Sequence, residues 1–178
     1  MEIANTMSVK KPSVNWSAIH IGVIGLLCAI IGNMYPATML QKHLYLGGGV
    51  LLMISALLEK QEYFIALEVV VIVCALLAYL PDHGTLKMAV PLLLSLFSVG
   101  YLYYRGLLKS PASLIGVVGL VFLGLGYATL NPVIYLIGGI ALTVYSAISY
   151  YQGVKIALLW AILKAIFSFT ALLAINIL

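Results

Sequence analysis

The sequence predicts an all-α polytopic integral membrane protein with seven transmembrane helices. Of its 178 residues, 64% are hydrophobic and 8% are charged, and the mean hydropathy is +1.17. Soluble domains carry about 25% charged residues. The apolar residues extend along the whole chain in runs close to the length of a bilayer-crossing helix, which leaves no room for a water-soluble domain. We therefore expect a single membrane domain over residues 1–178.

Seven apolar spans follow one another, separated by charges, prolines and polar clusters. They cover residues 16–34, 44–59, 61–80, 87–105, 111–129, 132–151 and 154–178. A helix that crosses the bilayer needs about 20 residues, and only the second span is clearly shorter. The second and third spans are separated only by the polar cluster at residues 59–62, which predicts a tight turn and places the two helices side by side. The polar stretch before the first span and the lack of a cleavage site after it predict a retained helix.

The basic residues give the expected orientation. One side of the membrane receives Lys10, Lys11, Lys60, Arg105, Lys109 and Lys155, and the other side receives Lys42 and Lys87. The positive-inside rule then places the N-terminus in the cytoplasm and the C-terminus in the periplasm. Short loops and the lack of a targeting segment fit a bacterial inner (cytoplasmic) membrane. Because the basic residues stand singly at the ends of apolar runs, we expect the lipid bilayer and no nucleic acid as a partner.

Two pairs of segments match each other along the chain. Residues 21–26 read IGVIGL and residues 115–120 read IGVVGL, an offset of 94. LYLGGGVLLMISALL from residue 44 aligns without a gap with IYLIGGIALTVYSAI from residue 134, an offset of 90. Matches in the same order and at nearly the same offset predict two triple-helix repeats, residues 16–80 and 111–178, joined by a linker helix at 87–106. An odd number of linking helices makes the repeats parallel, about an axis along the membrane normal.

This plan of three, one and three helices resembles the SWEET and PnuC transporter families, and the expected orientation is similar to that of PnuC, the carriers of vitamin B3 precursors. LLEKQEYFIALEVV at 57–70 and ALLWAILKAIF at 157–167 resemble the third and seventh helices of PnuC carriers. The resemblance implies a central substrate site with Trp160 at the aromatic position. Lys164 then stands where the family has a substrate-facing Asn, and Glu68 lies close to the equivalent Asn. Because charges replace amides, the vitamin specificity does not carry over.

Lys164 and Glu68 are the principal candidate site residues. Lys164 lies ten residues into the last span, about 15 Å deep and near the midplane. An ionised lysine there costs at least about 2.5–3.5 kcal/mol, so it needs a partner or a function. Glu68 enters from the same side at a depth within reach, and pairing would lower the cost of both charges. The alternatives are a purely structural ion pair between the two halves, or a deprotonated Lys164 in an apolar pocket.

Four further residues are candidates for contact with a solute. Trp160 precedes Lys164 by four residues and shares its helix face, so a planar or anionic solute would suit the pair. Packing against a neighbouring helix is the alternative for Trp160. Tyr45 and Tyr135 occupy matching repeat positions, and each also begins a span, where tyrosine often anchors at the membrane interface. Asn33 is a candidate to line the same cavity.

We therefore expect a small-solute membrane transporter or facilitator, with no cofactor, no metal and no enzymatic activity. No GxSxG, HExxH or P-loop motif appears, and the histidines lie far apart in the sequence. One alternative is a non-catalytic membrane subunit or scaffold in which Lys164 pairs with another protein. A remote alternative is a retinal-binding seven-helix protein, because a lysine in the seventh helix with a carboxylate in the third resembles the Schiff base and counterion of rhodopsins. A homo-oligomer or a membrane-protein partner stays open.

Overall fold

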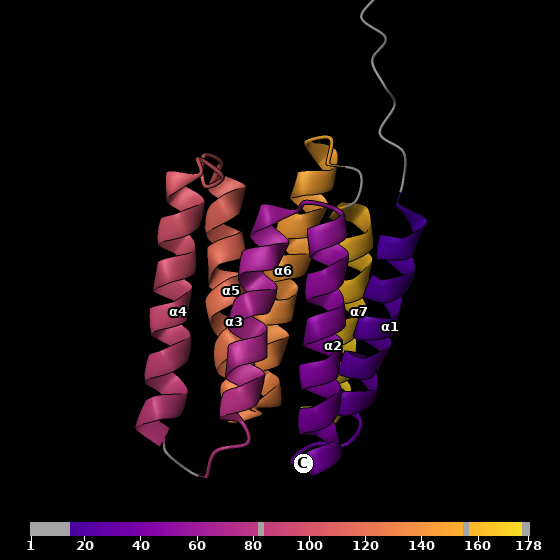
Figure 1. Cartoon of the computed structure of the whole chain (residues 1–178), viewed down its shortest axis with the longest axis vertical. Coiled ribbons are helices and arrows are strands. Elements are labelled where there is room, and N and C mark those ends of the chain that lie inside the picture. The colour runs from indigo at the N-terminus through magenta and orange to yellow at the C-terminus, as the bar shows by residue number, and fades with distance from the viewer. Residues whose placement is uncertain (1–14, 82–83, 155–156, 176–178) are drawn as a thin grey trace, which may run out of the picture.

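The computed structural model describes residues 15–81, 84–154 and 157–175, and this part of the chain is all-helical (Figure 1). Seven helices stand side by side and alternate in direction. They are α1 (Trp16–Asn33), α2 (Met39–Leu58), α3 (Glu62–Leu77), α4 (Gly84–Tyr104), α5 (Pro111–Thr129), α6 (Pro132–Tyr151) and α7 (Ala157–Ile175). Lys10, Lys11, His83 and Lys155 lie outside the described residues.

The helices fall where the sequence predicts them, with differences at the ends. The bounds of α5 and α6 are those predicted, because Pro111 and Pro132 each occupy a first helical position, where a missing N–H costs nothing. Helix α2 begins five residues earlier than predicted. The hydroxyl of Thr38 accepts a hydrogen bond from the backbone N–H of Gln41 at 3.2 Å, and this cap makes the polar segment 39–43 the first helical turn.

Five of the described helices are long and apolar enough to cross a membrane: α1, α4, α5, α6 and α7. Helix α3 has only 16 residues, and α2 begins with a polar turn that lowers its mean hydropathy. The chain is therefore a helical membrane protein, as predicted.

The turn between α2 and α3 is as tight as predicted. Lys60 adopts a left-handed conformation with φ of 55°, which in most helix ends is left to glycine. The backbone N–H of Gln61 donates back to the carbonyl of Ala56 at 3.0 Å. The chain reverses within three residues, and α3 packs along α2.

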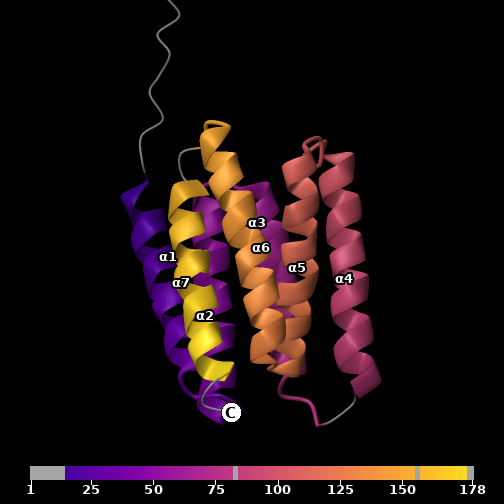
Figure 2. The ribbon, with the colours of Figure 1, turned by 180° about the vertical axis from the view of Figure 1, so that it is seen from behind.

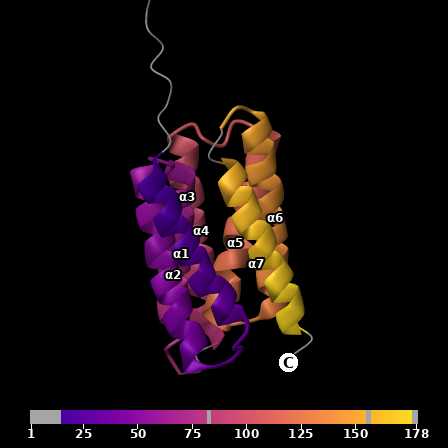
Figure 3. The ribbon, with the colours of Figure 1, turned by 90° about the vertical axis from the view of Figure 1, so that its right-hand side faces the viewer.

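Six helices form a closed ring, and the remaining helix, α4, lies outside it. Around the ring, α1 packs on α2, α2 on α3, α3 on α5, α5 on α6, α6 on α7, and α7 on α1. Helix α4 packs against the outside of α3 and α5 (Figures 1 and 2). Viewed from the side, α1, α2 and α3 form one half of the bundle and α5, α6 and α7 the other (Figure 3). Side chains from both halves meet inside the ring.

Glycines allow the closest helix contacts within each half. A Cβ on Gly48 would lie 2.7 Å from the carbonyl oxygen of Gly25, and one on Gly25 would lie 2.9 Å from that of Gly48. In the other half, a Cβ on Gly138 would lie 2.6 Å from the backbone nitrogen of Leu123. Backbone atoms cannot move away as a side chain can, so α1 and α2, and likewise α5 and α6, are packed backbone to backbone.

We expect Gly48→Ala to lower the free energy of unfolding by about 1–3 kcal/mol, because its methyl group would force α1 and α2 apart. The adjacent Gly47→Ala is the matched control, since a Cβ there meets nothing within 4 Å. The measurement is the thermal unfolding midpoint of both variants in detergent. Equal midpoints for the two would contradict the observed packing of α1 on α2.

Candidate functional site

Lys164 and Glu68 form an ion pair inside the ring. Lys164 Nζ lies 3.4 Å from Glu68 Oε1, and the two residues are 5% and 0% exposed. Their helices, α7 and α3, are not adjacent in the ring, so the two long side chains reach across its interior. They are the buried charged residues of the part of the chain that the structure describes. The sequence predicts depths that differ by about 6–9 Å, within the combined reach of the two side chains, and the structure brings the two charged groups into contact.

The pair leaves hydrogen-bonding capacity unused. A lysine ammonium has three protons to donate, and the described structure gives Lys164 one acceptor, Glu68 Oε1. Within the same described residues, Glu68 Oε2 is buried without a partner. The separation of 3.4 Å also exceeds the value of about 2.7–2.9 Å typical of a charge-assisted hydrogen bond. A polar group entering the ring would find both a donor and an acceptor.

A stack of two aromatic rings covers the ion pair on one side. The rings of Phe64 and Trp160 lie 4.4 Å apart between centroids, inclined by 10°. Each precedes one of the charged residues by four positions, so the stack lies one helical turn closer to the start of α3 and α7. Lys164 Nζ lies 5.8 Å from the Trp160 ring centroid, within cation–π range. Trp160 and Lys164 therefore lie next to each other on one helix face, as their spacing predicts.

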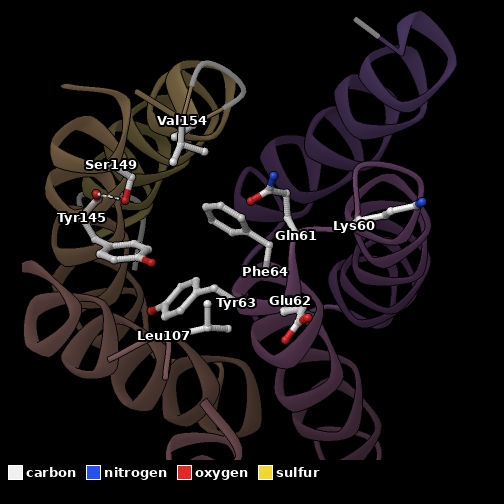
Figure 4. Close-up of a pocket in the computed structure, with 10 residues that line it drawn as sticks. Lys60, Gln61, Glu62, Tyr63, Phe64, Leu107, Tyr145, Ser149 and Val154 are labelled. Carbon is white, nitrogen blue, oxygen red and sulfur yellow. Dashed lines mark hydrogen bonds between the residues drawn. The ribbon is translucent and has the colours of Figure 1, made fainter. Parts of the chain in front are cut away.

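A cavity of about 250 Å³ leads from the end of the bundle to this stack. Figure 4 shows its lining, which includes the Phe64 side chain. Its other lining residues are Lys60, Gln61, Glu62, Tyr63, Leu107, Tyr145, Ser149, Val154 and Ala157. Because Phe64 faces the cavity and stacks on Trp160, the two rings separate the cavity from the ion pair.

A tyrosine cluster lies on the opposite side of the ion pair. Tyr45 packs against Tyr127 and Tyr135, with ring centroids 4.6 Å and 5.4 Å away. Phe167, about one turn beyond Lys164 on α7, joins it through Tyr135 at 5.9 Å. Tyr45 and Tyr135 are both fully buried, so neither is a membrane-interface anchor.

Asn33 connects the tyrosine cluster to the last helix. It accepts a hydrogen bond from the Tyr45 hydroxyl and donates through Nδ2 to Thr170 Oγ1 at 2.8 Å. Gln41 Nε2 donates to the same tyrosine hydroxyl at 3.0 Å. The predicted residues Asn33, Tyr45 and Tyr135 therefore lie together, with Tyr45 in contact with both of the others.

Phe64 and Tyr127 also lie around the ion pair, and neither was predicted from the sequence. The signal for Phe64 is its spacing, since it precedes Glu68 by the four residues that separate Trp160 from Lys164. Tyr127 follows Asn33 by 94 residues, the offset of the first repeat match. Both signals depend on comparing the two predicted repeats with each other.

Within residues 15–81, 84–154 and 157–175, no three His, Cys, Asp or Glu side chains lie together as a metal site would require. Comparison of the chain with known protein families, with curated proteins and with solved structures gives no match. What the site can do is therefore inferred from its own geometry and charge.

Proposed function

We propose that this protein is a small-solute transporter or facilitator of the bacterial inner membrane, with its solute bound between α3 and α7 at Lys164 and Glu68. The observation that carries the proposal is the buried ion pair with unused donors and an unused acceptor. It lies between the Phe64–Trp160 stack, which a cavity reaches, and the tyrosine cluster. Ionisable groups inside a membrane protein usually mark a solute or ion pathway.

Equivalent contacts in the two halves support a duplication with all seven helices crossing the membrane. A Cβ on Gly32 would touch the Tyr45 ring, and a Cβ on Gly126 would touch the Tyr135 ring. These pairs are related by the offsets of 94 and 90 found in the sequence. The contact of α1 with α7 has its counterpart in that of α5 with α3, as a twofold axis through the ring requires. Helix α4 is then the linker.

The third helices of the two repeats match at an offset of 96. Gly49 of α2 faces Val71 and Ile72 of α3, and Gly139 of α6 faces Phe167 and Ser168 of α7. At the same offset Phe64 corresponds to Trp160, and Glu68 to Lys164. Each stacked or charged pair thus joins two equivalent positions near the axis. In transporters built from repeats, alternating access is largely a rocking of one repeat against the other around a central site.

In this proposal the N-terminal end of α1 faces the cytoplasm, as the positive-inside rule predicts from the basic residues. The cavity lies at that end of the bundle, beside the turn at Lys60. In the proposed cycle this conformation faces the cytoplasm, and the tyrosine cluster closes the periplasmic side. Opening then requires Phe64 and Trp160 to separate.

A solute with a planar part and an anionic group would place its ring on Trp160 and its anion at Lys164. A scaffold role, with Lys164 bound to an acidic residue of another protein, is less well supported, because Lys164 already has an acidic partner in its own chain.

The first experiment is thermal unfolding of the purified protein in detergent with vitamins, nucleosides, sugars, amino acids and carboxylates. We expect one class to stabilise it, since ligand at a hundredfold excess over Kd contributes about 2.7 kcal/mol. Lys164→Ala should abolish that shift. Lys109→Ala, an exposed lysine outside the cavity lining, should keep it. If no compound shifts the unfolding of the native chain, the transport proposal is wrong.

A further inference from the structure

The charge balance of the ring interior restricts what can bind there. Among the described residues, Lys164 is the buried positive charge of the ring interior and Glu68 is its buried negative charge. The site is therefore electrically neutral before a solute enters. A buried ion without a partner is strongly unfavourable, because the surroundings do not replace its hydration.

Different classes of solute affect this balance differently. A simple anion bound to Lys164 draws the ammonium from Glu68 and leaves a buried carboxylate unpaired. A simple cation bound to Glu68 leaves Lys164 unpaired in the same way. A solute with both an anionic and a cationic group pairs with each side chain, so two ion pairs replace one and no charge is left uncompensated.

The local geometry suits such an insertion. The Lys164 ammonium has protons free to donate, and Glu68 Oε2 is free to accept, so a solute can bind each side chain before their mutual contact breaks. The contact between Nζ and Oε1 is already long, at 3.4 Å. The two side chains extend from helices that are not neighbours in the ring, so a movement of one half against the other in the proposed cycle would separate them and make room for a small group.

We infer that the solute is a zwitterion of zero net charge, of the amino-carboxylate class. Its carboxylate binds Lys164, its ammonium group binds Glu68, and its apolar part lies toward the Phe64–Trp160 stack. This inference rests on the transport function proposed above and adds the class of solute to it.

The repeat relation provides a sharp test variant. Because Glu68 and Lys164 occupy equivalent positions about the proposed twofold axis, the exchanged pair Glu68→Lys with Lys164→Glu recreates the same site turned by half a revolution. A zwitterion can bind the exchanged site in the opposite sense. Glu68→Gln and Lys164→Gln each remove one charge and leave the other unbalanced.

The probes form two series of three compounds, and the three compounds of a series have the same apolar group. L-Phenylalanine is compared with phenylpropionate and phenylethylamine, and L-leucine with methylpentanoate and methylbutylamine. Binding at neutral pH is followed by calorimetry and by thermal unfolding in detergent. We expect one of the two amino acids to bind with a Kd at least about tenfold lower than that of the acid and the amine of its series. Each single glutamine variant should lose about tenfold or more, and the exchanged pair should stay within about tenfold of the native chain.

The possible outcomes separate the inference from the function on which it rests. If the acid binds as tightly as its zwitterion, with uptake of a proton, the site is an anion and proton site, and the inference is wrong while the transport proposal stands. The same holds if an uncharged sugar or nucleoside binds through Lys164. If no solute of any class binds, both are overturned. Should the exchanged pair fail to fold, the two probe series on the native chain still decide.

Discussion

Lys164→Met alone is expected to lower the free energy of unfolding by about 3–5 kcal/mol, because it leaves the Glu68 carboxylate buried without a counter-ion. Glu68→Leu alone should have an effect of similar size, since it leaves the Lys164 ammonium buried without a counter-ion. The double variant removes both charges and replaces them with apolar groups of similar volume. It should recover most of the loss, as replacing a whole buried ion pair often costs little.

The measurement is a double-mutant cycle on unfolding free energies in detergent, with solute binding followed in parallel. A folded double variant that no longer binds the solute would separate the stabilising role of the pair from its role in recognition. The contrary result is a Lys164→Met variant as stable as the native chain, which would mean that the ion pair does not form. A double variant that binds normally would move the solute site elsewhere.

Trp160→Ala is expected to lower the free energy of unfolding by about 3–5 kcal/mol and to weaken solute binding. Its indole is 1% exposed, stacks on Phe64 and lies beside the Lys164 ammonium. Removing it would join the cavity to the ion pair and admit water to both charges. The other tryptophan provides the matched control, because Trp16 is 67% exposed, and Trp16→Ala should change stability by no more than about 0.5 kcal/mol.

Fluorescence gives an independent reading of the same residue. In a Trp16→Phe background, Trp160 is the only tryptophan of the chain. Emission of that variant should respond to a bound solute, because binding separates the indole from Phe64 or changes the charges beside it. If a solute stabilises the protein but leaves this emission unchanged, Trp160 is a packing residue and the stack does not cover the site.

Much of the helix arrangement was predictable because it depends on local signals. Prolines fix the starts of α5 and α6, and the polar cluster at residues 59–62 fixes the turn before α3. The possibility of an ion pair between Lys164 and Glu68 could be inferred from depth, since each helix residue rises by about 1.5 Å and both helices begin on the same side, but the contact itself required the structure.

The tyrosine cluster and the Phe64–Trp160 stack could not be predicted in the same way. Tyr45 appeared to stand at the start of its span, but the capped turn before it places it inside the bundle. Its contacts with Tyr127 and Asn33 join residues on different helices, whose rotation about their own axes the sequence did not define. Phe64 is one apolar residue among many until Trp160 is placed against it.

The position of α4 makes the exterior of the molecule one-sided, because this helix packs outside the ring on one side only. Helix α4 packs over the seam where α3 meets α5, whereas no helix of the described residues lies over the seam between α1 and α7, its counterpart in the proposed duplication. Between α1 and α7, the Asn33 amide donates a hydrogen bond to the hydroxyl of Thr170. If the two halves move in the proposed transport cycle, the seam that α4 covers should change least. Distances between probes on α1 and α7 would then report the movement.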